Sequence, residues 1–185
     1  MIITDHREKL INAIIYFAKN TKFCGKTKLM KLLYYLDFYH FKETGKSVTG
    51  ESYEAWKMGP VPKKTYEELS GTMRPDMEKG IQKLPEEGFQ KIIPKKKFES
   101  DYFSKRELRI LKEVSFIFKD TKADQMVAST HLKNDPWHKT LKEKGKNQEI
   151  DYLLAIDQEG SRLSYEEAKD RVKERQEIHD IFGVA

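Results

Sequence analysis

The sequence predicts a compact, mainly α-helical protein of the α+β class, with a small antiparallel β element between the second helix and the C-terminal helices. Three observations predict it. Apolar residues recur at helical spacing in both halves of the chain. Ser104 with Glu107 and Ser164 with Glu167 form the Ser-x-x-Glu pattern that opens helices. Val48–Met58 is rich in β-branched and aromatic residues, which favour strands.

Two helices are expected in the first 44 residues. Asp5 and Glu8 resemble a capping box before a helix from about His6 to Lys19. A second helix is expected from about Thr27 to Thr44, ended by Gly45, which can adopt the left-handed conformation common after a helix.

The second expected helix is apolar on two sides, whereas a surface helix needs only one apolar stripe. One stripe holds Leu29, Leu32, Leu33, Leu36 and His40, the other holds Met30, Tyr34, Phe38 and Phe41, and the polar sector holds Lys28, Lys31, Tyr35 and Lys42. Either the helix is central and buried, the interpretation that the pattern favours, or it presents its second stripe to a partner. Asp37 lies between the stripes and needs hydrogen-bond partners if it is buried.

The rest of the chain follows the same signals. In chain order we expect a short helix over Lys63–Ser70, a loop over Gly71–Gly88, an edge strand over Phe89–Phe98, and helices ending near Lys119, over Ala123–Lys133 and over Trp137–Lys144. A final helix follows Ser164, and its residues Glu166–Glu177 are almost all charged, which is typical of a solvated outer layer.

Composition predicts one domain over residues 1–185 and excludes several classes of protein. The 35 basic residues are nearly balanced by 30 acidic ones, so the net charge of +5 raises the expectation of nucleic-acid binding only slightly. Cys24 is the only cysteine, which excludes an internal disulfide and fits a cytoplasmic protein. We find no signal peptide and no stretch approaching the ~20 apolar residues of a membrane span.

No residue pattern predicts catalysis, a metal or a cofactor. His131 and His138 are two helical turns apart, but Pro136 interrupts them and two ligands do not complete a zinc shell. The run from Cys24 to Thr27 imitates only the tail of a phosphate-binding loop and lacks its upstream glycine. We therefore expect a protein that is not an enzyme.

The segment Gly45–Pro62 instead predicts a surface that contacts another protein. Gly59 and Pro60 favour a rigid corner, on which Tyr53, Trp56 and Met58 are expected to be exposed. Tryptophan and tyrosine are common anchors of interfaces, and methionine adapts to different partners. The expected contact set is Tyr53, Trp56, Met58, Gly59 and Pro60, together with Lys31 and Tyr35 of the second helix. For Trp56, a core position is an equal alternative.

A DNA-binding or phage regulatory protein is the alternative function. Its lysines would be Lys26, Lys28 and Lys31, then Lys95–Lys97, then the lysine-rich run Lys139–Lys146. Lysines with few arginines favour phosphate contact over base readout. No helix-turn-helix with a readable recognition helix stands out, so we do not expect nucleic-acid binding at physiological salt.

Several of these residues together resemble the Panacea domain, or SocA-like antitoxin domain. The resemblance is carried by Lys28–Tyr35, Gly45 and Gly50, Tyr53–Val61, Ser104 with Glu107, and His131 followed by Pro136 and Trp137. It extends over roughly Lys28 to Leu141, and the Ala-Trp-x-x-Gly-Pro-Val run is its most specific part. Met58 departs from the pattern, since an aromatic residue is common there.

The resemblance implies a bacterial or phage antitoxin that neutralises a cognate protein toxin by direct binding, with no cofactor. SocA-type members also hand their toxin to a protease as adaptors. It further implies a mainly helical fold with a small β element. Trp137 is expected to pack in the core, and His131 is expected to be a structural cap or a hydrogen-bond partner rather than a catalyst. The charged helix at 164–182 has no counterpart in the family pattern, so toxin choice is one role we consider for it.

Overall fold

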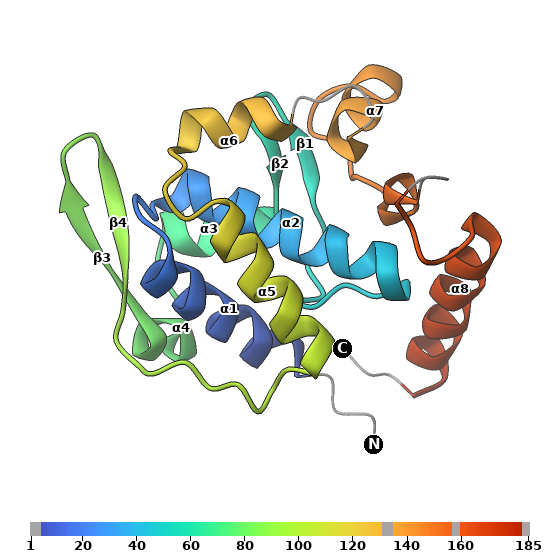
Figure 1. The fold of residues 1–185 in the computed structure, drawn as a ribbon, viewed down its shortest axis with the longest axis horizontal. Helices are drawn as coiled ribbons and strands as arrows, with labels where there is room; N and C mark the ends of the chain where they lie inside the picture. The colour runs from blue at the N-terminus through green and yellow to red at the C-terminus, as the bar shows by residue number, and fades with distance from the viewer. Residues whose placement is uncertain (1–4, 131–134, 157–159, 183–185) are drawn as a thin grey trace.

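The computed structural model describes residues 5–130, 135–156 and 160–182 (Figure 1). The α-helices in these ranges are α1 His6–Asn20, α2 Lys26–Thr44, α3 Lys63–Ser70, α4 Pro75–Gly80, α5 Lys105–Ile117, α6 Ala123–Thr130, α7 Pro136–Glu143 and α8 Tyr165–Phe182. Strands β1 Glu54–Trp56 and β2 Gly59–Val61 form one antiparallel hairpin, and β3 Ile81–Glu86 and β4 Phe89–Pro94 form another. A 3-10 helix, η1, spans Tyr152–Ala155. The predicted α+β class is confirmed.

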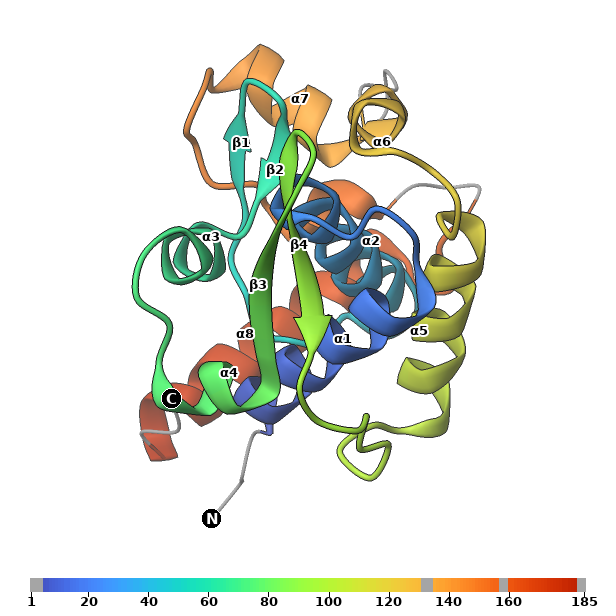
Figure 2. The ribbon, with the colours of Figure 1, turned by 90° about the vertical axis from the view of Figure 1, so that its left-hand side faces the viewer.

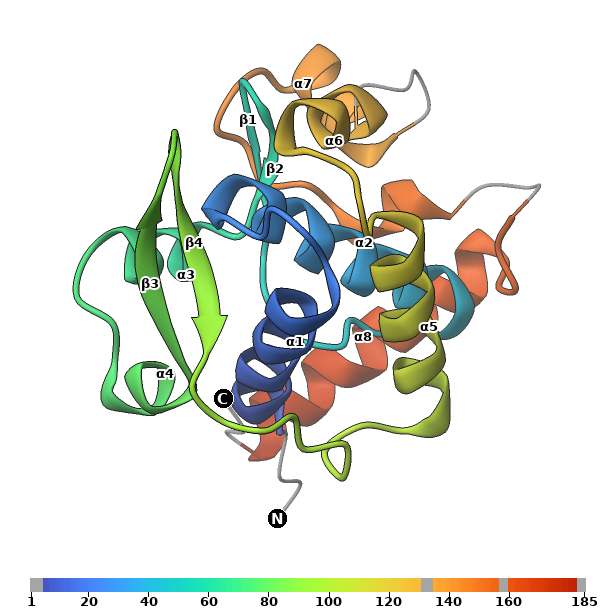
Figure 3. The same cartoon turned by 60° about the vertical axis from the view of Figure 1, so that its left-hand side comes forward.

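Helix α2 is the centre of the fold (Figures 1 and 3). It packs against α1, α3, α5, α6, β2, β4 and η1, and both predicted apolar stripes are buried. The interpretation as a central helix is therefore confirmed. The polar sector predicted for it is wrong, because Lys28, Lys31 and Tyr35 are also buried. Seven elements cover the helix, so a stripe of lysines has no solvent to face.

The two hairpins differ from the expected strands in one respect. The segment Val48–Met58 contributes β1, and Phe89–Phe98 contributes β4, as predicted. The loop expected over Gly71–Gly88 is wrong, because it contains α4 and β3. Pro75 opens α4 at its first position, where proline is favoured. Pro85 lies in β3, which is tolerated because both strands of a two-stranded sheet are edge strands.

Helix ends follow the predicted caps in three of four places. Ser104 with Glu107 and Ser164 with Glu167 form reciprocal hydrogen bonds, and Gly45 is left-handed with a φ of 68°. The capping box predicted at Asp5 is wrong, since that side chain makes no cap hydrogen bond. Among the described helices, none combines the length and apolar character needed to cross a membrane.

Asp37 ties the middle of α2 to the segment that leads into β1. Its carboxylate accepts hydrogen bonds from the backbone N–H groups of Val48 and Thr49 at 2.7 and 2.8 Å. It also accepts from the hydroxyls of Thr49 and Tyr53 at 2.5 and 2.7 Å. Burial raises the pKa of this carboxyl, and these four donors oppose that shift. The expectation that a buried Asp37 would find partners is confirmed.

Replacing Asp37 with alanine is expected to lower the free energy of unfolding by about 3 kcal/mol or more. Four buried donors would lose their acceptor, and each unsatisfied buried group costs about 1–3 kcal/mol. Urea unfolding of Asp37→Ala measures the change. Asp170→Ala, an exposed position on α8, is the matched control and should change stability by less than about 0.5 kcal/mol. Equal effects of the two substitutions would contradict this role.

Candidate partner-binding site

The turn of the β1–β2 hairpin projects the most exposed part of the predicted corner. Trp56 pairs with Gly59, so Lys57 and Met58 form the two-residue turn. Met58 is 58% exposed, whereas Trp56 is half-buried. Gly59 has a φ of 108°, a backbone conformation that residues with a Cβ rarely adopt. The corner is therefore specified by its glycine, and the turn faces solvent.

The indole of Trp56 is half-buried and held by two neighbours. Its Nε1 donates to Glu54 at 2.9 Å, and its ring meets the edge of Tyr66 with centroids 4.9 Å apart. Lys63 forms an ion pair with the same Glu54 at 3.3 Å. The corner surface, by which we mean Trp56, Lys57, Met58 and Tyr66, thus combines β1, the turn and α3.

A buried lysine holds the corner from below. The Nζ of Lys31, on α2, donates to the carbonyl oxygen of Pro60 at 2.9 Å, and the residue is only 1% exposed. Burial lowers the pKa of Lys31 to about 7, and the nearby Asp135 opposes that shift. Because Pro60 has no N–H and a fixed φ, this carbonyl is a stiff point of attachment between α2 and β2.

Helix α7 holds the other side of the hairpin. Asp135 accepts from the hydroxyl of Tyr34 at 2.8 Å and caps α7 through the N–H of Trp137 at 2.9 Å. Burial raises the pKa of Asp135 to about 6. The indole Nε1 of Trp137 donates to the carbonyl of Trp56 at 2.8 Å. Trp137, which the sequence predicted to lie in the core, therefore positions the backbone of Trp56 in the corner.

The outer edge of β1 is also covered. The N–H of Ala55 donates to the carbonyl of Gln148, and the N–H of Asn147 donates to the carbonyl of Ala55, both at 2.8 Å. These bonds use the backbone groups through which an exposed edge strand would pair with another chain. Any partner of the hairpin therefore meets side chains rather than a free strand edge.

The structure separates the predicted contact residues into two groups. Trp56 and Met58 reach the surface, while Gly59 and Pro60 form the buried backbone of the corner. The expected exposure of Tyr53 is wrong. That residue is 0% exposed, because its hydroxyl binds Asp37 and its ring packs edge-on against Tyr34.

Lys31 and Tyr35 are corrections of the same kind, since α2 is central and neither residue faces a partner directly. The ring of Tyr35 stacks on Phe118 with centroids 4.7 Å apart. Trp137 packs in the core as predicted and is 3% exposed, and Pro136 is the first residue of α7. His131, predicted as a structural cap, lies outside the described residues.

Sequence reasoning missed Asp135, Tyr34 and Tyr66 as parts of this region. The signal for Asp135 was present, because an aspartate before a proline is a common start of a helix. Nothing in the sequence indicated that Tyr34 would reach Asp135 across 101 positions. Nothing in the sequence separated Tyr66 from the other residues of its short polar helix. Its packing against Trp56 is visible only in the structure.

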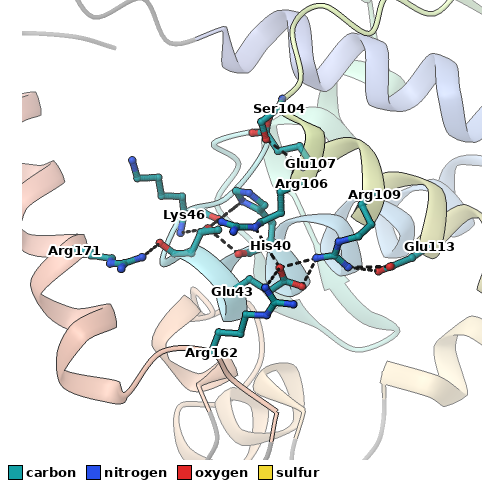
Figure 4. Close-up of polar contacts among 11 residues, drawn as sticks. His40, Glu43, Lys46, Ser104, Arg106, Glu107, Arg109, Glu113, Arg162 and Arg171 are labelled. Atoms are coloured by element: carbon teal, nitrogen blue, oxygen red, sulfur yellow. Dashed lines mark hydrogen bonds and ion pairs between the residues drawn. The ribbon is translucent and has the colours of Figure 1, made fainter.

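A second polar cluster surrounds Glu43 at the C-terminal end of α2 (Figure 4). Arg109 binds both carboxylate oxygens of Glu43 at 2.5 and 2.6 Å, while Arg106 and Arg162 lie 3.5 and 3.9 Å away. These arginines come from α5 and from the segment before α8. They hold the pKa of the Glu43 carboxyl below its usual value, against desolvation, which acts in the opposite direction.

Helix α8 attaches to the same end of α2. Arg171 donates to the carbonyl of Thr44 and Arg175 to the carbonyl of Gly45, both at 2.9 Å. Cations here complement the partial negative charge and unpaired carbonyls of a helix C-terminus. Most other residues of α8 are exposed, which confirms its interpretation as an outer layer.

Among the described residues, neither a cluster of metal ligands nor a low-pKa thiol is present. Within these ranges, no group of three or more His, Cys, Asp and Glu residues is placed to hold a metal ion. Cys24 is buried, and burial raises the pKa of its thiol to about 11. Because the thiolate is the reactive form, this cysteine is a packing residue.

Comparison with known families identifies the chain. The model of the antitoxin SocA-like, Panacea domain family matches residues 29–138, more than half of the sequence. The chain therefore belongs to this family. The matched region begins in α2 and ends in α7, so it includes the hairpin and its buried supports. The chain matches none of the curated proteins or solved structures with which it was compared.

The stability of the protein is expected to rise with pH above neutrality because of Lys31. Its ordinary pKa of 10.5 falls to about 7 in the fold. Between these values the unfolded chain binds a proton that the native chain does not, so the unfolding free energy increases with pH. Lys31→Met should reduce that slope by up to about 1.4 kcal/mol per pH unit.

Urea unfolding of both proteins between pH 7 and about 9 measures the difference in slope. Cys24 is present in both proteins, so the proton that the unfolded chain loses from this thiol near its ordinary pKa of 9.0 affects both slopes equally and cancels in their difference. Parallel slopes in the two proteins would show that Lys31 stays protonated in the native state.

Proposed function

We propose that this protein is an antitoxin that neutralises a cognate protein toxin by direct binding, and that the corner surface is part of the contact. Membership in the antitoxin SocA-like family supports the general role. The observation that carries the site is the solvent-exposed Met58 beside a half-buried Trp56 on a turn that is fixed from below.

The hydrogen bonds that hold the turn favour binding, because the turn loses little conformational entropy when a partner binds. Lys31 holds the carbonyl of Pro60, and Trp137 holds the carbonyl of Trp56. A surface that is already rigid loses less conformational entropy on association than a flexible loop does. Met58 adds an unbranched, polarisable side chain that can adapt to the shape of the partner's surface.

The lysine patches give less support to DNA binding than the sequence alone suggested. Of the three lysines that open α2, the amino groups of Lys28 and Lys31 are buried against backbone carbonyls. Lys95 donates to the carbonyl of Glu78 at 2.7 Å but stays exposed. Phosphate contacts would have to come from the remaining surface lysines, among which acidic residues are interspersed.

Delivery of the toxin to a protease, as described for SocA-type members, is a finer proposal. Sequestration alone leaves the toxin's lifetime unchanged or longer, whereas delivery shortens it. Following toxin abundance after translation is stopped, with and without this protein, separates the two mechanisms. In both mechanisms the protein acts by binding and not as an enzyme.

Substitutions of the corner surface are expected to impair neutralisation without unfolding the protein. The toxin is sought in the adjacent reading frame, and rescue of growth on co-expression identifies it. Met58→Asp and Trp56→Ala should each weaken toxin binding by about 2 kcal/mol, roughly 30-fold in Kd, the scale of an interface anchor. Isothermal titration calorimetry measures binding, and circular dichroism measures folding.

Phe116→Asp is the control, because Phe116 is an exposed apolar side chain on α5. It should leave binding and rescue unchanged. Normal neutralisation by folded Met58→Asp would remove the corner surface from the contact. Failure of the unsubstituted protein to rescue growth would instead contradict the choice of toxin or the antitoxin role.

A further inference from the structure

A groove of about 1160 Å³ lies on the surface beside the N-terminal end of α2. It is bordered by the connection between α1 and α2, by the turn of the β3–β4 hairpin and by the start of α6. Figure 3 shows this hairpin standing beside the start of α2. We call it the lysine groove, because six lysines line it: Lys19, Lys22, Lys26, Lys28, Lys91 and Lys122.

The hairpin wall of the groove is fixed to the α1–α2 connection by backbone contacts. Gly25 forms an isolated antiparallel bridge with Lys91, and the N–H of Ile92 donates to the carbonyl of Cys24 at 2.9 Å. A Cβ at Gly25 would lie 2.6 Å from a ring carbon of Phe89. The carbonyl oxygen of Gln90 would lie 3.2 Å from the same Cβ, so glycine favours this close approach of the hairpin.

The opposite wall is fastened by Lys28. Its buried Nζ donates to the carbonyls of Lys22, Phe118 and Thr121 at 2.7, 2.7 and 2.6 Å. The N–H of Lys22 also donates to the carbonyl of Lys119 at 2.8 Å. One ammonium group thus joins the α1–α2 and α5–α6 connections, so the groove is formed before anything binds.

An aromatic side chain is presented at the groove under backbone strain. Phe23 has a φ of 54°, which is uncommon for any residue with a side chain and especially for a bulky one. The residue is nevertheless 42% exposed, and the Nζ of Lys122 lies 5.7 Å from the centroid of its ring. Backbone strain at a partly exposed residue is common at binding sites.

The charge of the groove is predominantly positive. Lys22 pairs with Asp120 and Lys91 pairs with Glu86, and Lys28 is buried against carbonyls. The charges that remain for a ligand are those of Lys19, Lys26 and Lys122. Among the lining residues of the described chain, only Glu86 and Glu87 are acidic. An exposed phenyl ring next to uncompensated lysines fits a ligand that carries both carboxylates and apolar side chains.

We propose that the lysine groove binds an acidic segment of a partner polypeptide, with an apolar residue of that segment on Phe23. The groove residues and charges carry this inference by themselves, and only the identification of the partner as the toxin rests on the proposed function. A polypeptide fits better than a nucleic acid, because a segment that mixes acidic and apolar residues can place its apolar positions beside Glu86 and Glu87, whereas a nucleic acid carries a phosphate at every nucleotide. No arginine lines the groove within the described residues.

The groove is continuous with the corner surface. The Nζ of Lys26 lies 4.2 Å from the ring centroid of Tyr66, and Tyr66 in turn packs against Trp56. Figure 2 shows α3 and both hairpins on the same side of the molecule. A single partner can therefore occupy the corner with its folded surface and the groove with an acidic segment.

Fluorescence anisotropy with a short labelled peptide tests the proposal on the full-length protein. The probe alternates glutamate with leucine and phenylalanine, and a second probe has lysine in place of each glutamate. We expect the acidic probe to bind, more tightly at low ionic strength, and the basic probe not to bind. Labelled oligothymidine serves as the nucleic-acid probe and should not displace the acidic peptide at physiological salt.

Paired variants locate the site. Lys19→Glu with Lys122→Glu should weaken binding of the acidic peptide at least about tenfold, the ratio that 1.4 kcal/mol represents. Lys97→Glu with Lys112→Glu makes the same change in net charge at exposed lysines elsewhere and should have little effect. Equal losses in the two pairs would show attraction to net charge rather than to the groove, and would overturn the proposal.

Phe23→Asn separates binding from folding. Asparagine tolerates a left-handed backbone better than phenylalanine does, so thermal unfolding should show no loss of stability while peptide binding weakens. A less stable variant with unchanged binding would make Phe23 a structural residue and overturn its role. Binding of oligothymidine that is lost in the Lys19 and Lys122 variant would assign the groove to nucleic acid instead.

The two proposals fail in different ways. If the protein binds the acidic probe but rescues no toxin, the groove stands and the antitoxin role fails. If it rescues growth equally well with and without the groove substitutions, and no acidic probe binds, the antitoxin role stands and the groove fails.

Discussion

The burial of α2 over most of its surface is the constraint on which the rest of this structure depends. A helix in that position cannot leave charged side chains without partners, because an unpaired buried charge is too costly. Lys28, Lys31 and Asp37 each solve this by bonding to groups of other segments. Lys28 holds the α5–α6 connection, Lys31 holds β2, and Asp37 holds the segment before β1. Three charged residues of one helix thus fasten three connections of the fold.

The surfaces that we propose for binding are carried by segments that Lys28 and Lys31 hold by hydrogen bonds. Lys31 supports the corner that presents Trp56 and Met58, and Lys28 supports the wall of the lysine groove. In both places the exposed groups are carried by short segments rather than by long helices, and carbonyls of these segments are hydrogen-bonded to the central helix. Pre-organised loops on a stable scaffold are a common arrangement for recognition.

The local patterns predicted most helices well, and the failures have identifiable causes. The serine caps at Ser104 and Ser164 and the glycine at Gly45 act within a few residues, so the sequence alone specifies them. The strand β3 was missed because its proline and glycine neighbours predict a loop, and its pairing with β4 depends on burial of Ile81 and Ile92. The corner at Gly59 and Pro60 was predicted. The exposure predicted for Tyr53 was wrong, because its burial depends on Asp37 in a different element.

The sequence by itself determined the family, the helical framework, the central position of α2 and the rigid corner at Gly59 and Pro60, because these depend on periodicity and on backbone conformations that few residues allow. Only the tertiary structure decided which polar residues are buried. Whether a lysine faces water or a carbonyl depends on segments distant along the chain, as with Lys28 and Phe118, which are 90 positions apart. The lysine groove also depends on the tertiary structure, because its walls come from segments that are distant in the sequence and meet only in the folded chain.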